Sequence, residues 1–293
     1  MSDESWTVGA DVSPDQLGPA DFKRIATLVT EHSGIKLPAG KRSMLEGRVR
    51  KLAQVAGYGS ITQYCAYLFR NNGLTAELPH LIDAVTTNKT DFFREPQHFQ
   101  FMETRMLPEL LQRRRGHSGA KPMLKAWSAA CSNGAEAYSI AMVLADAAMA
   151  RRDFDWSILG TDISRRILID ARQAIYPTEM IATVPPAKQS RYVMHGRPGS
   201  SQPKVRIVPE LRRLVRFAPV NLIDRAYPFD IDFDMIFLRN VLIYFEKEDQ
   251  QAVVVRLTQH LRPGGFLMLG HAESMIGTEL GLRQVAPATF QVP

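Results

Sequence analysis

The chain has 293 residues, of which 45% are hydrophobic and 23% are charged, a composition typical of a folded globular protein. No apolar run is long enough to cross a bilayer and the first residues are unlike a signal peptide, so we expect no membrane insertion. Two cysteines, Cys65 and Cys131, cannot form a disulfide framework or a structural zinc site, which favours a cytoplasmic protein.

The formal net charge of +6 favours an acidic partner but does not choose among nucleic acid, anionic lipid and protein. An ordinary soluble surface explains this charge equally well.

Residues 1–18 have no periodic apolar pattern, and we expect a flexible tail there. Residues 19–88 predict a small helical domain, with helices near 20–33, 39–56, 61–69 and 74–84. Residues 20–90 hold ten Lys or Arg against five Asp or Glu, so most of the excess charge lies in this domain. The second of these helices has a basic group made of Lys41, Arg42, Arg48, Arg50 and Lys51.

From residue 89 to residue 293 the pattern changes to strands that alternate with helices. Strands are predicted near 123–128, 156–160, 234–238 and 266–270, with a turn at 263–265. Helices are predicted near 96–115, 135–150 and 247–261, and from 164 onward. This alternation predicts an α/β domain with a mostly parallel, Rossmann-like wound sheet covered on both faces. Residues 190–218 break the alternation and predict a small antiparallel β insert.

Polar residues follow several of the predicted strands, where wound sheets bind their ligands. The loop 129–134 precedes a helix, and its backbone N–H groups can hold an anion, but its glycines do not match a dinucleotide loop. Asp162 ends the next strand, where a carboxylate can accept hydrogen bonds from ribose hydroxyls. The plainer explanations are a helix cap for Asp162 and a favourable helix dipole for Glu136. Together with the loop, however, Asp162 favours a nucleoside site.

Two further strand ends add polar side chains to this edge. Asn221 follows the insert, and its amide can recognise an adenine edge. Arg239 and Asn240 follow the strand 234–238, and Tyr244 lies four residues beyond Asn240, on the same face if this stretch is helical. A surface ion pair for Arg239 and a core-edge aromatic for Tyr244 are the plainer alternatives.

The segment 86–95 (Thr-Thr-Asn-Lys-Thr-Asp-Phe-Phe-Arg-Glu) combines hydroxyls, an amide, two aromatics and an arginine. It is the first of several segments that carry one resemblance, and the others are Trp127–Ser132, Gly134, Glu136, Thr161–Ile163, Asn221–Leu222, 239–245, 263–265 and 270–273. Together these segments resemble the chemotaxis receptor methyltransferases, the CheR family. The resemblance covers nearly all of the chain after the tail. Two departures are Ala135, where the family often has Glu, and Leu238, where it often has Cys.

The resemblance implies a class I S-adenosylmethionine-dependent protein-glutamate O-methyltransferase that forms γ-methyl esters on chemoreceptor cytoplasmic helices, with S-adenosylhomocysteine as its product. It implies that Arg94 and Tyr244 lie nearest the methyl group. The cofactor contacts that it implies are Asn88, Thr90, Arg94, Glu136, Asp162, Asn221, Leu222, Arg239 and Asn240.

A glutamate carboxylate has a pKa of about 4.3, so it is ionised at neutral pH and needs no general base. The sulfonium already activates the methyl group, so we expect no metal requirement either. Arg94 can orient a carboxylate through a forked, charge-assisted pair, and Tyr244 can add one hydrogen bond. The enzyme's main contribution is therefore expected to be the positioning of the reacting groups.

The basic group on the second helix is expected to attract the acidic receptor helices, although a solvated helix face explains it equally well. In some members of the family the antiparallel insert captures a receptor's C-terminal peptide, and the sequence leaves this open. We expect no nucleic-acid partner and a monomer. The alternatives are a methyltransferase for another acceptor and a non-catalytic module that senses S-adenosylmethionine. A nicotinamide-dependent enzyme fits the glycine loop poorly.

Overall fold

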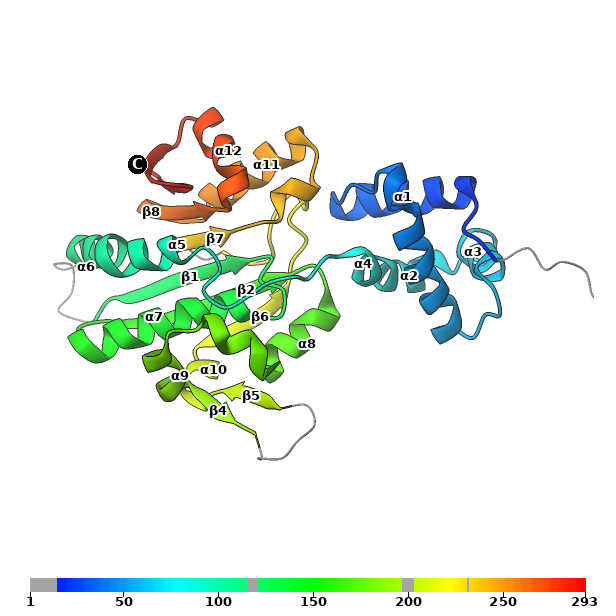
Figure 1. Ribbon diagram of the computed structural model, residues 1–293. Helices are drawn as coiled ribbons and strands as arrows, with labels where there is room; N and C mark the ends of the chain where they lie inside the picture. Colours follow the sequence, from blue (N-terminus) through cyan, green and yellow to red (C-terminus); the bar gives the residue numbers. More distant parts are fainter. Residues whose placement is uncertain (1–14, 115–120, 197–202, 231) are drawn as a thin grey trace, which may run out of the picture. The chain divides into compact units, whose positions relative to one another are not determined.

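The computed structural model describes residues 15–114, 121–196, 203–230 and 232–293 (Figure 1). The chain divides into two compact units, one made of Met1–Glu31 and Leu37–Val85 and the other of His32–Lys36 and Thr86–Pro293. This division falls within three residues of the predicted domain boundary at residue 88.

The first unit is entirely helical in its described part. Its elements are α1 (Pro19–Ser33), the short 3₁₀ helix η1 (Ala39–Lys41), α2 (Arg42–Val55), α3 (Ile61–Arg70) and α4 (Leu74–Val85). Side chains at helical spacing, such as Ile25 with Val29 and Leu45 with Val49, are fully buried and form its core. The Ser60 side chain accepts a bond from the Gln63 backbone N–H at 3.1 Å, which explains where α3 begins.

The last residues of the predicted tail belong to this helical unit. Leu17 is fully buried, and its carbonyl accepts a bond from the Arg42 side chain at 2.9 Å. The Asp15 carboxylate accepts the Ile61 N–H at 2.6 Å and so occupies the start of α3. The expected tail was therefore too long by residues 15–18, because one apolar side chain and one acid give no periodic pattern. The rest of it, residues 1–14, lies outside the described residues.

The second unit is built on a seven-stranded sheet in the order β6-β2-β1-β7-β8-β10-β9. The first five strands in this order are parallel, and β10 and β9 are antiparallel at one edge. The strands are β1 (Met123–Ala129), β2 (Asp155–Asp162), β6 (Val215–Pro219), β7 (Phe233–Leu238), β8 (Leu261–Leu269), β9 (Arg283–Ala286) and β10 (Thr289–Gln291). The predicted wound, mostly parallel sheet is confirmed.

Helices cover both faces of this sheet, as Figure 1 shows. Successive residues of β1 alternate between two hydrophobic clusters: Ala126 belongs to the cluster that includes α7, and Trp127 to the cluster that includes α11. The helices are α5 (Pro96–Phe101), α6 (Leu107–Arg114), α7 (Ala135–Arg151), α8 (Arg165–Gln173), α9 (Pro186–Tyr192), α10 (Pro209–Arg212), α11 (Lys247–Thr258) and α12 (Ser274–Glu279). The helix expected at 96–115 contains a π-helical turn, η2 (Met102–Met106), between α5 and α6.

A second, antiparallel sheet has the order β3-β5-β4, formed by β3 (Ile175–Pro177), β5 (Lys204–Ile207) and β4 (Val193–His195). The predicted insert exists, but its bounds differ from 190–218. It takes in β3, which was not predicted, and it excludes β6, which pairs with β2 in the main sheet. Short strands of three residues leave too little alternation to assign them to one sheet or the other.

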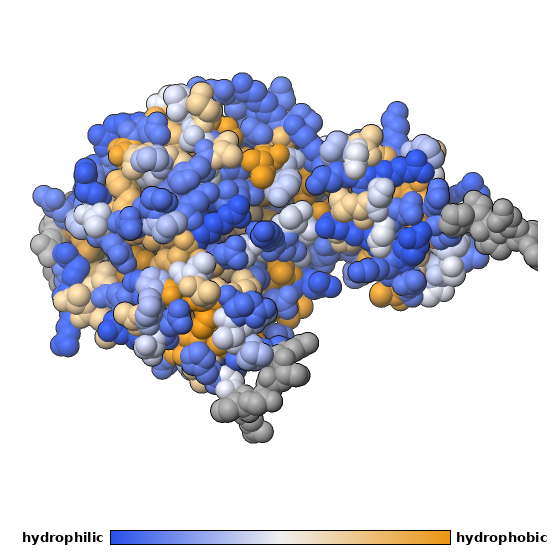
Figure 2. Space-filling model, viewed as in Figure 1, coloured by the Kyte–Doolittle hydropathy of each residue, from blue (hydrophilic) through white to orange (hydrophobic). Residues whose placement is uncertain are grey.

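The predicted turn at 263–265 lies inside β8, where Gly264 has a φ of +75° and the register with β7 shifts. The pattern of glycines marks a bulge in the strand rather than its start. No helix in the described part of the chain is long and apolar enough to span a membrane. Hydrophilic residues cover most of the face shown in Figure 2, with hydrophobic ones in separate patches.

Candidate active site at the strand ends

The loop after β1 is shaped by residues with left-handed backbone conformations. Ala130, Ser132 and Gly134 have φ values of 56°, 52° and 86°. A Cβ on Gly134 would lie 3.1 Å from the Ala171 Cβ, so both the conformation and the available space require glycine here. The loop therefore turns sharply into α7 and brings backbone close to the carboxyl edge of the sheet.

Asp162 ends β2 beside this loop, as the sequence predicted. It is 6% exposed, and its carboxylate accepts the backbone N–H groups of Ser132 at 2.9 Å and Ser164 at 3.0 Å. These bonds fix the side chain at the carboxyl edge of the sheet. A fixed carboxylate at the end of the second strand fits the ribose hydroxyls of a nucleoside cofactor.

The segment 86–95 is anchored against the same loop. The Ser132 hydroxyl donates to the Asn88 carbonyl at 2.9 Å, and the Phe93 N–H donates to the Ser139 hydroxyl at 2.9 Å. Phe92 and Phe93 are both buried in the core. Thr90 is half-buried. The aromatic pair thus holds the polar residues of the segment at the strand ends.

Arg94 follows the two buried aromatic residues and is exposed. Among the described residues its guanidinium forms a 3.4 Å bond from Nη1 to the Lys89 carbonyl. A carboxylate that reached this position would meet a cation that the protein leaves accessible. This placement suits the predicted role of Arg94.

Arg239, at the end of β7, is the centre of a buried charge network. Its guanidinium lies 3.1 Å from the Glu95 carboxylate and 3.2 Å from the Glu136 carboxylate, and it donates to the Arg94 carbonyl. Its side chain is 2% exposed, so the surface ion pair considered for Arg239 is wrong. The Ser128 hydroxyl donates to the second oxygen of Glu136 at 2.7 Å. This network ties the segment 86–95 to the ends of β1 and β7.

The two carboxylates that share Arg239 respond in opposite directions. Burial raises the pKa of Glu136, and the nearby negative charge of Glu95 adds to that, against the attraction of Arg239. Burial also raises the pKa of Glu95, but Arg239 and the hydrogen bond from Asn240 outweigh it and lower the pKa.

Glu273 organises the turn after β7, a role that the sequence did not reveal. It is 2% exposed. One carboxylate oxygen accepts the N–H groups of Asn240 and Gly270, each at 2.8 Å, and the other accepts the Leu242 N–H at 2.7 Å. Asn240 has a φ of 60°, a conformation that needs such support. The residues 239–244 are not an α-helix, and only Leu242–Tyr244 form a 3₁₀ turn, η4.

Asn240 joins this turn to the charge network, because its side-chain amide donates to Glu95 at 3.2 Å. Tyr244 is half-buried at the end of the turn. Asn221 donates through its amide to the His32 carbonyl at 2.6 Å, within the same unit. Leu222 is buried in the core. Contact of Asn221, Leu222 and Asn240 with the cofactor remains a prediction, as does the place of Tyr244 near the methyl group.

The basic residues predicted to receive a substrate lie in the first unit. The Arg42 and Arg50 side chains bond to the carbonyls of Leu17 and Asp15, and Arg48 donates to the Ala84 carbonyl at 2.5 Å. Lys41 and Lys51 are exposed. At least part of this basic group therefore stabilises the helical unit itself.

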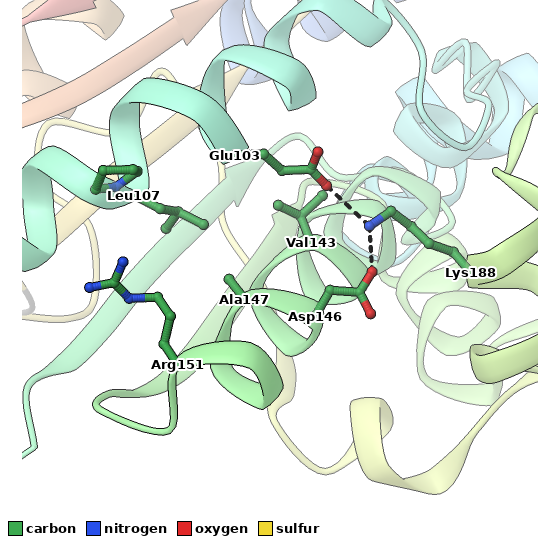
Figure 3. A pocket seen from close by; sticks show the side chains of 8 residues that line it. Glu103, Leu107, Val143, Asp146, Ala147, Arg151 and Lys188 are labelled. Atoms are coloured by element: carbon green, nitrogen blue, oxygen red, sulfur yellow. Dashed lines mark hydrogen bonds and ion pairs between the residues drawn. The ribbon is translucent and has the colours of Figure 1, made fainter.

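A pocket of about 260 Å³ elsewhere in the second unit is separate from this site (Figure 3). It is lined by Glu103, Leu107, Pro108, Val143, Asp146, Ala147, Arg151 and Lys188. Asp146 lies ten residues after Glu136 on α7, about 15 Å along the helix. Lys188 lies 2.6 Å from Asp146 and 3.1 Å from Glu103, and Arg151 lies 3.2 Å from Asp153, so both cations of the lining are paired with carboxylates.

A wound sheet with a glycine loop, a fixed strand-end carboxylate and a buried charge network at its carboxyl edge fits a protein that binds a nucleoside cofactor. Residues 88–290 match the family described as CheR methyltransferase, SAM binding domain, and residues 20–86 match CheR methyltransferase, all-alpha domain. The chain therefore belongs to the CheR methyltransferase family, and the resemblance seen in the sequence is confirmed.

Chemotaxis protein methyltransferases from several bacteria are similar along most of their length. Those of Salmonella typhimurium and Escherichia coli are each 37% identical over 258 residues, covering 88% of this chain and 85% of each relative. That of Borreliella burgdorferi is 33% identical over 272 residues, covering 92% of this chain and 93% of the relative. The chain is thus a methyltransferase enzyme of chemotaxis signalling that uses S-adenosylmethionine.

Proposed function

We propose that the protein transfers the methyl group of S-adenosylmethionine to glutamate side chains on the cytoplasmic helices of chemoreceptors, forming γ-methyl esters. The observation that carries this proposal is the convergence of Asp162, Glu136, Arg239 and the segment 86–95 at one edge of the sheet, in a chain that matches both CheR domains. We place the enzyme in the cytoplasm, where these receptor helices are found.

The cofactor supplies a methyl group activated by a sulfonium. In our proposal Asp162 accepts hydrogen bonds from its ribose, and Asn221 and Leu222 lie beside its adenine. The rest of the cofactor is surrounded by the ion pair of Glu136 with Arg239 and by the residues Asn88, Thr90 and Asn240. The buried ion pairs of Arg239 support this arrangement, because they hold the three polypeptide segments in one geometry.

Arg94 and Tyr244 are proposed to act on the substrate side. A glutamate carboxylate is already ionised at neutral pH, so the protein has to orient it rather than deprotonate it. The exposed guanidinium of Arg94 can form a forked pair with one carboxylate, and lysine lacks this planar geometry. Tyr244 can donate one hydrogen bond to the carboxylate beside the methyl group.

The direct test is incubation with methyl-labelled S-adenosylmethionine and membranes rich in chemoreceptors, followed by treatment with alkali. A glutamate methyl ester releases its label as volatile methanol. Label that stays on the acceptor in alkali would show N- or C-methylation and would support the alternative of a different acceptor. Cofactor binding without transfer to any receptor would support the alternative of a sensing module.

We further propose that Lys41 and Lys51 attract the acidic receptor helix. Both are exposed, whereas Arg42, Arg48 and Arg50 also bond to carbonyls within their own unit. Reversal of both lysines to glutamate should reduce receptor methylation and leave the affinity for S-adenosylhomocysteine unchanged. Lys23→Glu, an exposed charge on α1, is the matched control. If Lys23→Glu does equal damage, the attraction comes from net charge and not from Lys41 and Lys51 in particular.

Capture of a receptor's C-terminal peptide at the second sheet is a separate proposal. In that sheet β4 and β3 are the edge strands, and either offers unpaired backbone groups to an added strand. Residues 197–202 of the connecting loop lie outside the described residues. Titration of the protein with the last residues of a receptor, with a scrambled peptide as control, tests this idea.

A further inference from the structure

Three side chains with metal-binding atoms meet beside the Arg239 network. Glu95 comes from the segment 86–95, His98 from α5, and His271 from η5 (His271–Glu273), the short turn after β8. Their ligand atoms all lie within 4.8 Å of one another. This group is distinct from the residues assigned to the cofactor or the substrate.

Two of the three side chains already have the spacing of metal ligands. Nδ1 of His98 lies 3.5 Å from Oε2 of Glu95. Two ligands of a tetrahedral zinc ion, each about 2.0–2.1 Å from the metal, are about 3.4 Å apart. His271 is exposed, and its ring lies 5.2 Å from that of His98, so a rotation of its side chain can bring in the third ligand.

His98 gives the second, independent sign of a ligand. His98 is 1% exposed, and neither of its ring nitrogens forms a hydrogen bond of good geometry in the described structure, although the Pro287 backbone lies near the ring. An unpaired buried polar group costs about 1–3 kcal/mol, so such groups normally have a partner. A metal ion bound to one ring nitrogen would supply this missing partner.

We propose that Glu95, His98 and His271 form a binding site for a divalent transition-metal ion, zinc above all, and that the ion competes with Arg239 for Glu95. Two imidazoles with one carboxylate favour zinc, cobalt or nickel over magnesium or calcium. The competition follows from the geometry, because the Glu95 oxygen that faces His98 is also 3.1 Å from the Arg239 guanidinium. When the metal ion coordinates Glu95, Arg239 keeps its ion pair with Glu136, whose carboxylate lies 3.2 Å from the guanidinium.

Metal binding itself is independent of the proposed function, but its effect on the cofactor rests on that function. Arg239 and Asn240 both contact Glu95, and both are proposed cofactor contacts. A metal that removes Glu95 from this network should weaken the binding of S-adenosylhomocysteine. By linkage, S-adenosylhomocysteine should weaken metal binding by the same factor.

The experiment is a titration of the full chain, free of any affinity tag and stripped of metals, with Co²⁺ followed by visible absorption and with Zn²⁺ followed by calorimetry. We expect one tight metal ion per chain, and for His271→Ala an affinity lower by about tenfold or more. His195→Ala is the matched control, since His195 is exposed on β4, outside the site. Thermal denaturation verifies that each variant folds.

The absence of a tight Co²⁺ signal, or equal affinities of His271→Ala and the unaltered protein, would overturn the proposed site. Zinc binding with an unchanged affinity for S-adenosylhomocysteine would overturn the competition for Glu95. A protein that binds zinc as expected but never binds S-adenosylhomocysteine would instead contradict the proposed function. The metal site is therefore contradicted by the metal titration, and the proposed function is contradicted by the titration with S-adenosylhomocysteine.

Discussion

Replacement of Glu273 with glutamine tests whether this residue positions the turn after β7. The carboxylate accepts three backbone N–H groups, two on one oxygen and one on the other. Glutamine has one oxygen, and its NH₂ group would face the third N–H. If the oxygen keeps Asn240 and Gly270, the Leu242 N–H loses its partner inside the protein.

The expected loss of stability follows from the number of hydrogen bonds that are lost. One lost charge-assisted bond together with a buried unpaired donor should destabilise the fold by about 2–3 kcal/mol. Total stabilities are about 5–15 kcal/mol, so the Glu273→Gln protein should still fold at room temperature. The turn carries Arg239 and Asn240, and its loosening should weaken S-adenosylhomocysteine binding by about tenfold, the equivalent of 1.4 kcal/mol.

Urea denaturation measures the first effect, and calorimetric titration with S-adenosylhomocysteine measures the second. Glu279→Gln is the matched control, because Glu279 is an exposed glutamate on α12 with partners on α11. We expect this control to match the unaltered protein within about 0.5 kcal/mol. If Glu273→Gln unfolds at the same urea concentration and keeps its affinity, Glu273 does not position the turn.

Further predictions concern single residues. Arg94→Ala should lose most methyl transfer to receptors with little change in thermal stability, and full activity in an intact fold would remove Arg94 from the mechanism. Gly134→Ala should destabilise the protein by about 1–3 kcal/mol in urea, since φ is 86° and the added methyl lacks space; an unchanged midpoint would refute this. Burial raises the pKa of Asp146, but hydrogen bonds from Lys188 and Tyr192 outweigh it and lower the pKa. Asp146 therefore stabilises the fold at neutral pH, and this contribution is lost as the pH falls through its folded pKa. Asp146→Asn should cost about 1–2 kcal/mol in urea at neutral pH and less near pH 3, and a constant difference would contradict the argument. Higher salt should reduce receptor methylation more than S-adenosylhomocysteine binding, and equal sensitivity of the two would argue against electrostatic attraction of the receptor.

Periodicity predicted the order of the elements, because buried helices and strands repeat their apolar residues with different spacing. The helical unit, the wound sheet and the existence of a second sheet all followed from it. The strand-end residues also followed, since the carboxyl ends of parallel strands meet at one edge. For that reason Asp162 and Arg239 could be placed near each other although 77 residues separate them in the sequence.

A strand of three residues is too short to show an alternation of apolar and polar residues, so its place in a sheet cannot be predicted from the sequence. The second sheet was predicted with the wrong bounds, because β3 carries no alternating pattern and β6 has the composition of the insert. Residues 15–18 were assigned to the tail, because the burial of Leu17 depends on α2 and not on its neighbours in sequence. Both differences concern short segments whose structure is decided by distant contacts.

The sequence by itself determined which chemistry to expect, since the residue types at the strand ends favour a nucleoside cofactor and the resemblance to the CheR family implies a glutamate substrate. Only the tertiary structure decided which of those residues interact. Arg239 reaches Glu95 and Glu136 from 144 and 103 residues away, and Glu273 holds a turn 31–33 residues before it. No sequence period encodes such pairs, because they arise when strands take their register and bury charges that must then find partners.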